Sequence, residues 1–266
     1  MASAGRSDAG ISVRAVAAAQ VFVNDPARPL LGEEDAHHLG RVLRLRRGEE
    51  VIACDGRGHW VRSRWQGDGS LTPLGTGAGP GPGAEGPGAD GTVQFEPRPE
   101  PALTVAFAPV KGERSEWVVQ KLTELGIDRI VPLRTERSVV RWTGVRGQAT
   151  VERLRRVARE AAAQSRRVWL PEVRETAPFA DLPTLGGPGE VVLAQLSGDR
   201  PTLAQRVVAV GPEGGWSEAE LASGLPTVGF GLSVLRAETP AVTAAALLVS
   251  LRTGTVAAAG NGTGRG

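Results

Sequence analysis

Residues 103–135 read LTVAFAPVKGERSEWVVQKLTELGIDRIVPLRT. The stretch begins with a nearly continuous apolar run over 103–110 and ends with the segment IDRIVPLRT over 127–135, whose middle is apolar. Between them, residues 113–125 carry apolar side chains at helical spacing, and Gly126 follows as a stop signal. A strand, a helix and a second apolar strand are typical of a parallel sheet with both faces covered. The stretch therefore predicts an α/β domain.

The same alternation continues toward the end of the chain. A helix is predicted over 151–164, where one face is formed by Val151, Leu154, Val157, Ala158 and Ala161. Further strands are predicted over 191–196, 206–210 and 226–232, a short helix after Trp216, and a last helix from Pro240 to about Leu251. We expect the α/β domain to occupy 101–253.

The chain before this domain has a different pattern. From Val21 onward, short apolar or alternating runs are separated by Gly48, Gly56 and Gly58. Such runs predict short strands joined by tight turns. We expect a small β-barrel over 21–98.

Three segments lack the apolar residues that a core needs. Residues 75–91 hold 8 Gly and 3 Pro among 17 residues, which predicts a flexible insertion in the first domain. Flexible tails are expected over 1–20 and 254–266.

The composition is ordinary for a globular protein, with 41% apolar and 23% charged residues in a chain of 266. Cys54 is the only cysteine, so no intramolecular disulfide can form. Residues 1–19 lack the apolar segment of a signal peptide, and no run of about 18 apolar residues occurs elsewhere. We expect a cytoplasmic protein without a membrane span.

Arginine supplies almost all of the positive charge. Of the 31 basic residues, only Lys111 and Lys121 are lysines. Arginine binds phosphate through two nitrogens and stacks on bases, so RNA is an expected partner. A GC-rich genome, which favours arginine codons, explains the same bias equally well.

A first candidate site is the stretch GPEGG over 211–215, between the predicted strand RVVAV and a helix. Its glycines are typical of a phosphate-binding loop, but Glu213 would repel a phosphate. Neither G-x-x-x-x-G-K-[ST] nor G-x-G-x-x-G is present. Ser217 and Glu220 match a capping box that starts the helix. The alternative is a turn in which the glycines only provide positive φ angles.

A second candidate is SVLRAETPAV over 233–242. A residue before proline is held extended, so Thr239 is the predicted N-cap of a helix that begins at Pro240. Arg236 and Glu238 then lie in the loop ahead of the helix, as functional groups or as a structural ion pair. Because both candidate loops follow apolar strands, they meet if those strands are neighbours.

A third candidate is the basic stretch that contains His37, His38, Arg41, Arg44, Arg46 and Arg47. It is either a contact surface for RNA or a solvated basic face. With three histidines in the chain and no carboxylate at ligand spacing, no metal site is expected. No Ser-His-Asp arrangement is indicated either.

Five segments together resemble one known family in order and spacing. They are HHLGRVLRLRRGEEVIACDGRG, KLTELGIDRIVPLRTERS, AAAQSRRVWLPEV, VGPEGGWSEAEL and VLRAETPAV. The family is the RsmE family of ribosomal RNA uridine-N3 methyltransferases, in the SPOUT superfamily. The resemblance implies a C-terminal α/β domain with a deep trefoil knot, an N-terminal PUA-like barrel, S-adenosyl-L-methionine as methyl donor, small-subunit (16S) ribosomal RNA as substrate, and a homodimer.

The resemblance also implies roles for individual residues. In the family the two loops enclose the cofactor, which carries a sulfonium cation and no phosphate, so Glu213 is tolerated there. The positions carried over as cofactor-binding are Gly211, Pro212, Glu213, Gly214, Gly215, Gly231, Leu235, Arg236 and Glu238. For catalysis, we expect Arg236 to offset negative charge on the uracil, and Glu238 to accept the N3 proton or to orient Arg236. Arg41, Arg44 and Arg137 are expected to grip the RNA backbone.

The chain departs from the family pattern at FGLS (230–233), at AQSRR (163–167) and at the opening of the last helix, which reads ETPAV. Two alternatives follow: a SPOUT methyltransferase that acts on a different RNA nucleotide, or a non-catalytic RNA-binding protein of the same fold. A nucleotide hydrolase is disfavoured because a P-loop lysine is absent.

Overall fold

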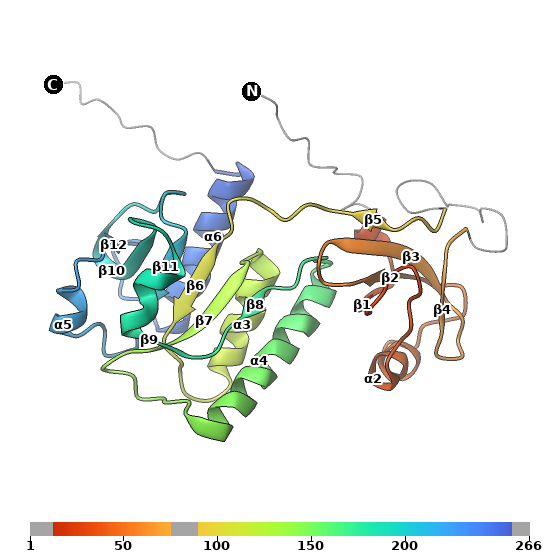
Figure 1. Ribbon diagram of the computed structural model, residues 1–266, viewed down its shortest axis with the longest axis horizontal. Coiled ribbons are helices and arrows are strands. Elements are labelled where there is room, and N and C mark those ends of the chain that lie inside the picture. The colour runs from red at the N-terminus through yellow and green to blue at the C-terminus, as the bar shows by residue number, and fades with distance from the viewer. Residues whose placement is uncertain (1–12, 76–89, 257–266) are drawn as a thin grey trace. The chain divides into compact units, whose positions relative to one another are not determined.

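The computed structural model describes residues 13–75 and 90–256 (Figure 1). The chain divides into two compact units, with the boundary between Arg98 and Pro99. A segment from much later in the chain, Ala162–Leu170, belongs to the first unit, which the sequence did not indicate.

The second unit contains a parallel sheet, as the apolar strands predict. Its strands follow the spatial order β12-β10-β11-β6-β7-β8, and β9 also pairs with β7. Every strand pair in this sheet is parallel. The strands are β6 (Thr104–Phe107), β7 (Arg129–Arg134), β8 (Glu172–Val173), β9 (Ala177–Pro178), β10 (Val191–Asp199), β11 (Val207–Val210) and β12 (Thr227–Val228).

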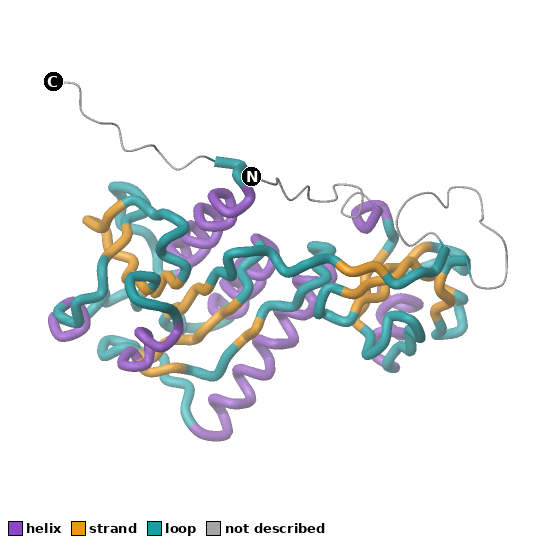
Figure 2. Tube along the Cα trace, turned by 45° about the horizontal axis from the view of Figure 1, so that its top comes forward, coloured by secondary structure: helices purple, strands orange, loops and turns teal. Residues whose placement is uncertain are grey.

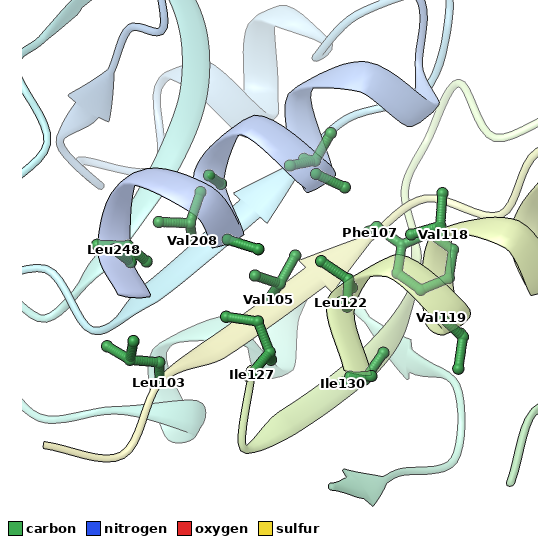
Figure 3. Close-up of a cluster of buried hydrophobic side chains, with 14 of the residues drawn as sticks. Leu103, Val105, Phe107, Val118, Val119, Leu122, Ile127, Ile130, Val208 and Leu248 are labelled. Carbon is green, nitrogen blue, oxygen red and sulfur yellow. The ribbon is translucent and has the colours of Figure 1, made fainter. Parts of the chain in front are cut away.

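Both faces of this sheet are buried, because alternate residues along each strand point to opposite sides. On one face, Val105 and Phe107 of β6 belong to a core that includes Val118 and Leu122 of α3 (Arg114–Leu125) and Leu248 of α6 (Glu238–Thr253) (Figure 3). Figure 2 shows the helices that flank the strands of this unit. α4 (Gly144–Gln164) contributes to the same core.

The opposite face has its own core. Ala106 of β6 and Ala209 of β11 pack there with Leu182 of the 3-10 helix η2 (Phe179–Leu185) and with Trp216. Trp216 directly precedes the short helix α5 (Glu218–Leu221). The sheet is therefore covered on both faces, and the loops lie at the ends of its strands.

Two helix starts differ from the prediction. α4 begins at Gly144, ahead of the predicted residue 151. α6 begins at Glu238, with Ala237 as its N-cap, so Thr239 is not the cap. The first four N–H groups of a helix have no partner within it, so Pro240 fits the third helical position as well as the first. Glu238 is consequently the first residue of the helix and not part of the loop.

The first unit is built from short strands, as its sequence predicts. Its sheet follows the order β1-β2-β3-β4, with β5 paired to β3; β1 and β2 are parallel and the other pairs antiparallel. The elements are β1 (Ala19–Phe22), α2 (Glu33–His37), the π-helix η1 (His38–Val42), β2 (Glu50–Cys54), β3 (His59–Trp65), β4 (Leu71–Pro73) and β5 (Gln94–Phe95). Val21, Val51, Val61 and Trp65 pack in its core.

The expected tail over 1–20 is wrong for its last eight residues, 13–20. Arg14 is only 3% exposed, lies over the ring of Trp60 at 5.1 Å, and forms an ion pair of 2.7 Å with Glu96. β1 begins at Ala19. An arginine can be buried in this way because its guanidinium keeps both an ion pair and a π contact.

The remaining expected flexible segments lie largely outside the described residues: 1–12 of the first tail, 76–89 of the insertion and 257–266 of the second tail. At the base of the insertion, a Cβ on Gly91 would lie 2.0 Å from the carbonyl oxygen of Leu74, so the two ends of the insertion meet. Gly254 ends α6 with a φ of 71°.

Candidate active site

The loop 211–215 leaves β11 at its carboxyl end and leads into α5. Its turn is closed by a hydrogen bond of 2.9 Å from the Gly215 N–H to the Pro212 carbonyl, and Gly215 has a φ of 67°. The predicted capping box is confirmed: Ser217 Oγ accepts from the Glu220 N–H at 3.2 Å, and the Glu220 carboxylate accepts from the Ser217 N–H at 2.9 Å. Glu213 and Gly214 are exposed at the tip.

Trp216 anchors this loop to the sheet. Its indole Nε1–H donates to the Ala194 carbonyl of β10 at 2.9 Å, and Phe179 meets its ring edge-on at 5.7 Å between centroids. A Cβ on Gly211 would lie 3.1 Å from the same ring. Gly211 therefore leaves the space that the indole occupies, so this glycine has a packing role.

Arg114 connects the two candidate loops. It is the first residue of α3, and its Nη2 lies 3.5 Å from Glu213 Oε1 while its Nη1 lies 3.4 Å from Glu238 Oε2. The loops thus approach each other although β10 separates β11 from β12 in the sheet. From the sequence, the loops were expected to meet if the strands before them were neighbours, but β11 and β12 are not neighbours. The loops are connected instead by Arg114, at the start of α3.

Arg236 and Glu238 do not form the ion pair that their spacing suggests. Among the residues the structure describes, the carboxylate of Glu238 pairs with Arg114 instead, and Arg236 is exposed without an ion pair. Gly231 has a φ of 129°, which favours glycine at that position. Leu235 is half-buried.

Arg137 lies beside the loop 211–215 as well. It follows β7, is exposed, and its Nη1 donates to the Gly214 carbonyl at 3.0 Å. Next to it, the Glu136 N–H donates to Glu220 Oε1 at 2.8 Å, which ties the segment after β7 to the start of α5. The structure therefore brings Arg137 to the candidate cofactor loop.

Arg41 and Arg44 belong to the first unit. Arg41 lies on η1 and Arg44 just after it, with a φ of 54°, and both are exposed. A positive φ is uncommon for a residue with a side chain, and the basic stretch here turns sharply after the π-helix.

One edge of the sheet carries most of these groups. Arg114, Arg137 and Glu213 follow the carboxyl ends of β6, β7 and β11, which are neighbours in the sheet. Ligands of open parallel sheets bind beyond this edge. Arg114 lies between the carboxylates of Glu213 and Glu238, and Arg137 lies beside the same loop, so positive and negative groups alternate along this edge.

Sequence analysis missed Arg114. A charged residue at the exposed start of a helix is ordinarily solvated, and its role depends on β6 lying next to β11, which the sequence does not specify. The only local signal was its position after an apolar strand that runs into a helix.

Across the described residues, 13–75 and 90–256, no three His, Cys, Asp or Glu side chains gather closely enough to hold a metal ion. No helix within those ranges combines the length and apolar character that a membrane crossing requires.

Comparison with known proteins gives two family matches. Residues 97–249 match the model of an RNA methyltransferase domain, and residues 31–64 match that of an RNA methyltransferase PUA domain. These matches cover parts of both units.

Three relatives carry the name ribosomal RNA small subunit methyltransferase E. That of a Synechocystis species is 32% identical over 81% of this chain and 70% of its own length. That of Mycobacterium tuberculosis is 30% identical over 79% of this chain and 82% of its own length, and that of Bacillus subtilis is 27% identical over 80% and 86%.

Solved structures share the fold. A ribosomal RNA small subunit methyltransferase E from Neisseria gonorrhoeae, bound to S-adenosyl methionine, superimposes with a TM-score of 0.68 at 22% identity, over 88% of this chain and 97% of that one. A probable rRNA-methyltransferase from Porphyromonas gingivalis gives 0.66 at 24% identity, over 90% and 100%.

Proposed function

The chain belongs to the family of ribosomal RNA small subunit methyltransferases E, and from this premise we propose that it methylates N3 of a specific uridine in 16S ribosomal RNA with S-adenosyl-L-methionine as methyl donor. The observation that carries the proposal is the bridge between the two candidate loops at the carboxyl edge of the sheet. Through it, Arg114 contacts both of the loops to which we assign the cofactor.

The charges of the site fit this cofactor. Glu213 is exposed in the glycine loop, and Glu238 shares Arg114 with it, so the cluster carries one net negative charge. A sulfonium cation is attracted to the two carboxylates of this cluster. We assign the cofactor to Gly211, Pro212, Glu213, Gly214, Gly215, Gly231, Leu235, Arg236 and Glu238.

When bound, the cofactor supplies an activated methyl group. The chain has to hold uracil N3 in line with that group, take up the N3 proton, and offset the negative charge that spreads onto the uracil oxygens. We assign the last role to Arg236, which is exposed and without an ion pair among the described residues. We assign proton uptake to Glu238, because its carboxylate contacts Arg114 and does not orient Arg236.

Several further features follow from the family resemblance. We propose that the RNA is gripped by Arg41, Arg44 and Arg137, and that the second unit contains the deep trefoil knot of the SPOUT superfamily. We also propose that the protein is a homodimer and acts in the cytoplasm. The exposed position of all three arginines supports the first of these assignments.

The test is to map modified uridines in 16S ribosomal RNA from cells with and without this protein. We expect one N3-methyluridine to be lost in the deletion strain and restored by the wild-type chain. Loss of a different modified nucleotide would contradict the assigned base, and an unchanged modification pattern would contradict the enzymatic function.

A further inference from the structure

We propose that Arg114 is a positioning residue: it holds Glu213 and Glu238, the two carboxylates through which the site favours S-adenosyl-L-methionine over its demethylated product, S-adenosylhomocysteine, and its own positive charge limits that preference. The inference rests on the proposed function. The two molecules differ by one methyl group and one positive charge at sulfur. A site that binds the positively charged sulfur more tightly than the neutral one favours release of the product after each transfer.

The guanidinium of Arg114 is fixed from three sides. Its Nε donates to the carbonyl of Lys111 at 3.2 Å, within the segment that leads into α3. The two terminal nitrogens are then left to reach Glu213 at 3.5 Å and Glu238 at 3.4 Å. A planar fork held by its own Nε can serve two carboxylates in a defined geometry, which a lysine ammonium cannot reproduce.

Arg114 joins two segments that no regular secondary structure connects. The loop 211–215 belongs to neither a helix nor a strand, and Glu213 is exposed at its tip. The N-cap of α6, Ala237, provides no side-chain hydrogen bond to the first turn. The contact between Arg114 and Glu238 is therefore a direct tie between the start of α6 and the start of α3.

The exposure of these groups indicates a role at the site and not in stability. The side chain of Arg114 is 43% exposed and that of Glu213 is 47% exposed, whereas that of Glu238 is 15% exposed. Solvated ion pairs of this kind contribute little to folding. Their charge nevertheless acts on a ligand bound nearby, because ligand and cluster exclude water from each other.

The charge of the cluster follows from its members: one guanidinium and two carboxylates leave one net negative charge. The cofactor carries one net positive charge and the product none. Arg114 thus lowers the attraction for the cofactor while holding the two carboxylates in place. Removing its charge and removing its fork therefore have different consequences.

The experiment measures the affinity of the full chain for both molecules by calorimetry, with the wild type, Arg114→Gln, Arg114→Lys and a control. Arg114→Gln removes the charge and the fork. We expect weaker binding of both molecules, with the preference for the cofactor raised roughly threefold, the size expected of one unit charge several ångströms away in a solvated site. The shift in preference should shrink as salt is added.

Arg114→Lys keeps the charge and loses the fork, so both affinities should fall by a similar factor with the preference unchanged. The matched control is Arg206→Gln. Arg206 directly precedes β11, at the opposite edge of the sheet from the loop 211–215, has a 47% exposed side chain, and pairs with Glu190 at 3.2 Å. This variant should leave both affinities unchanged.

Three outcomes overturn the inference: wild-type affinities in Arg114→Gln, an equal fall in both affinities without a change in preference, or the same change in preference in Arg114→Lys. A wild-type chain that binds no S-adenosyl-L-methionine would instead contradict the proposed function. Failure of the inference and failure of the function are therefore separate results.

Discussion

At the scale of single residues, Arg236 is the exposed cation of the segment that leads into α6. It forms no ion pair among the described residues, so its removal should not disturb the fold. If it offsets charge on the uracil, Arg236→Ala should lower turnover by about 100-fold, the usual effect of losing one stabilising donor. S-adenosyl-L-methionine affinity should change much less, because we assign the cofactor contact of Arg236 to its backbone, which the variant keeps. Methylation assays on small ribosomal subunits and calorimetry measure the two quantities. Unchanged turnover would reject the assignment.

Trp216 is the residue whose side chain holds the glycine loop against β10. Trp216→Phe removes the indole N–H that donates to the Ala194 carbonyl and leaves that acceptor without this bond. We expect the free energy of unfolding to fall by about 1 to 2 kcal/mol, the cost of a lost hydrogen bond and a small cavity. Urea denaturation measures it.

Trp117→Phe is the control for this change, because Trp117 is 44% exposed on α3. It should cost about 0.5 kcal/mol or less, as surface substitutions usually do. Equal losses of stability in the two variants would mean that the hydrogen bond from Trp216 to the Ala194 carbonyl does not contribute measurably to the free energy of unfolding.

At the scale of elements, the apolar periodicity of residues 103–135 was sufficient to predict β6, α3 and β7, including the stop at Gly126, whose φ is 108°. The first turn of α6 was not predictable in the same way. Ala237 caps the helix without any side-chain bond, so no residue type marked the boundary. Short strands such as β12 were also poorly defined, because two residues give no periodicity.

The candidate site was predicted in its two loops and missed in the residue that joins them. Loops can be predicted from local sequence signals, here glycines, a proline and a capping box. A bridge such as Arg114 depends on which strands are neighbours, and that is a property of the assembled sheet. The same holds for Arg137, whose contact with Gly214 links segments 77 residues apart.

The end of α6 is tied to the sheet by a buried ion pair between Arg252 and Asp128, whose side chains are 3% and 2% exposed. Arg252 also donates to the Gly126 carbonyl at 2.7 Å, and Asp128 accepts from the Leu103 N–H at 2.9 Å. Arg252→Met would leave the carboxylate buried without its guanidinium, so we expect a loss of about 3 to 5 kcal/mol in the free energy of unfolding.

Urea denaturation of Arg153→Met provides the comparison for this ion pair. Arg153 lies on α4 with a 55% exposed side chain and pairs with Glu116 of α3 at 3.0 Å. An exposed pair should contribute about 1 kcal/mol or less. If Arg252→Met costs no more than Arg153→Met, burial of the Asp128 pair does not strengthen the attachment of α6.

At the scale of the whole molecule, the two units could be predicted from the change in apolar pattern near residue 100. The assignment of Ala162–Leu170 to the first unit could not. Ala162 and Val168 are buried in the core of the first unit, together with Trp60 and Ile52. The helical pattern of α4 continues without a break up to this segment. Apolar periodicity shows which face of a helix is buried, but it does not show which unit that face packs against.

The proposed RNA-binding arginines are divided between the units, with Arg41 and Arg44 in the first and Arg137 in the second. If each neutralises one phosphate, Arg41→Gln, Arg44→Gln and Arg137→Gln together should lower the slope of log affinity against log salt by about 2 to 3, since each contact contributes roughly 0.7 to 0.9. Binding of a 16S ribosomal RNA fragment at several salt concentrations measures the slope.

Arg137 differs from the other two because its guanidinium also contacts the Gly214 carbonyl. Arg137→Gln alone should therefore weaken S-adenosyl-L-methionine binding several-fold as well as reduce the slope, whereas the pair Arg41→Gln and Arg44→Gln should reduce the slope only, because both residues lie in the first unit and the candidate cofactor loops in the second. An unaltered slope in the triple variant would remove these residues from the RNA contact. A slope reduced by the first-unit pair alone would assign Arg137 to the cofactor loop.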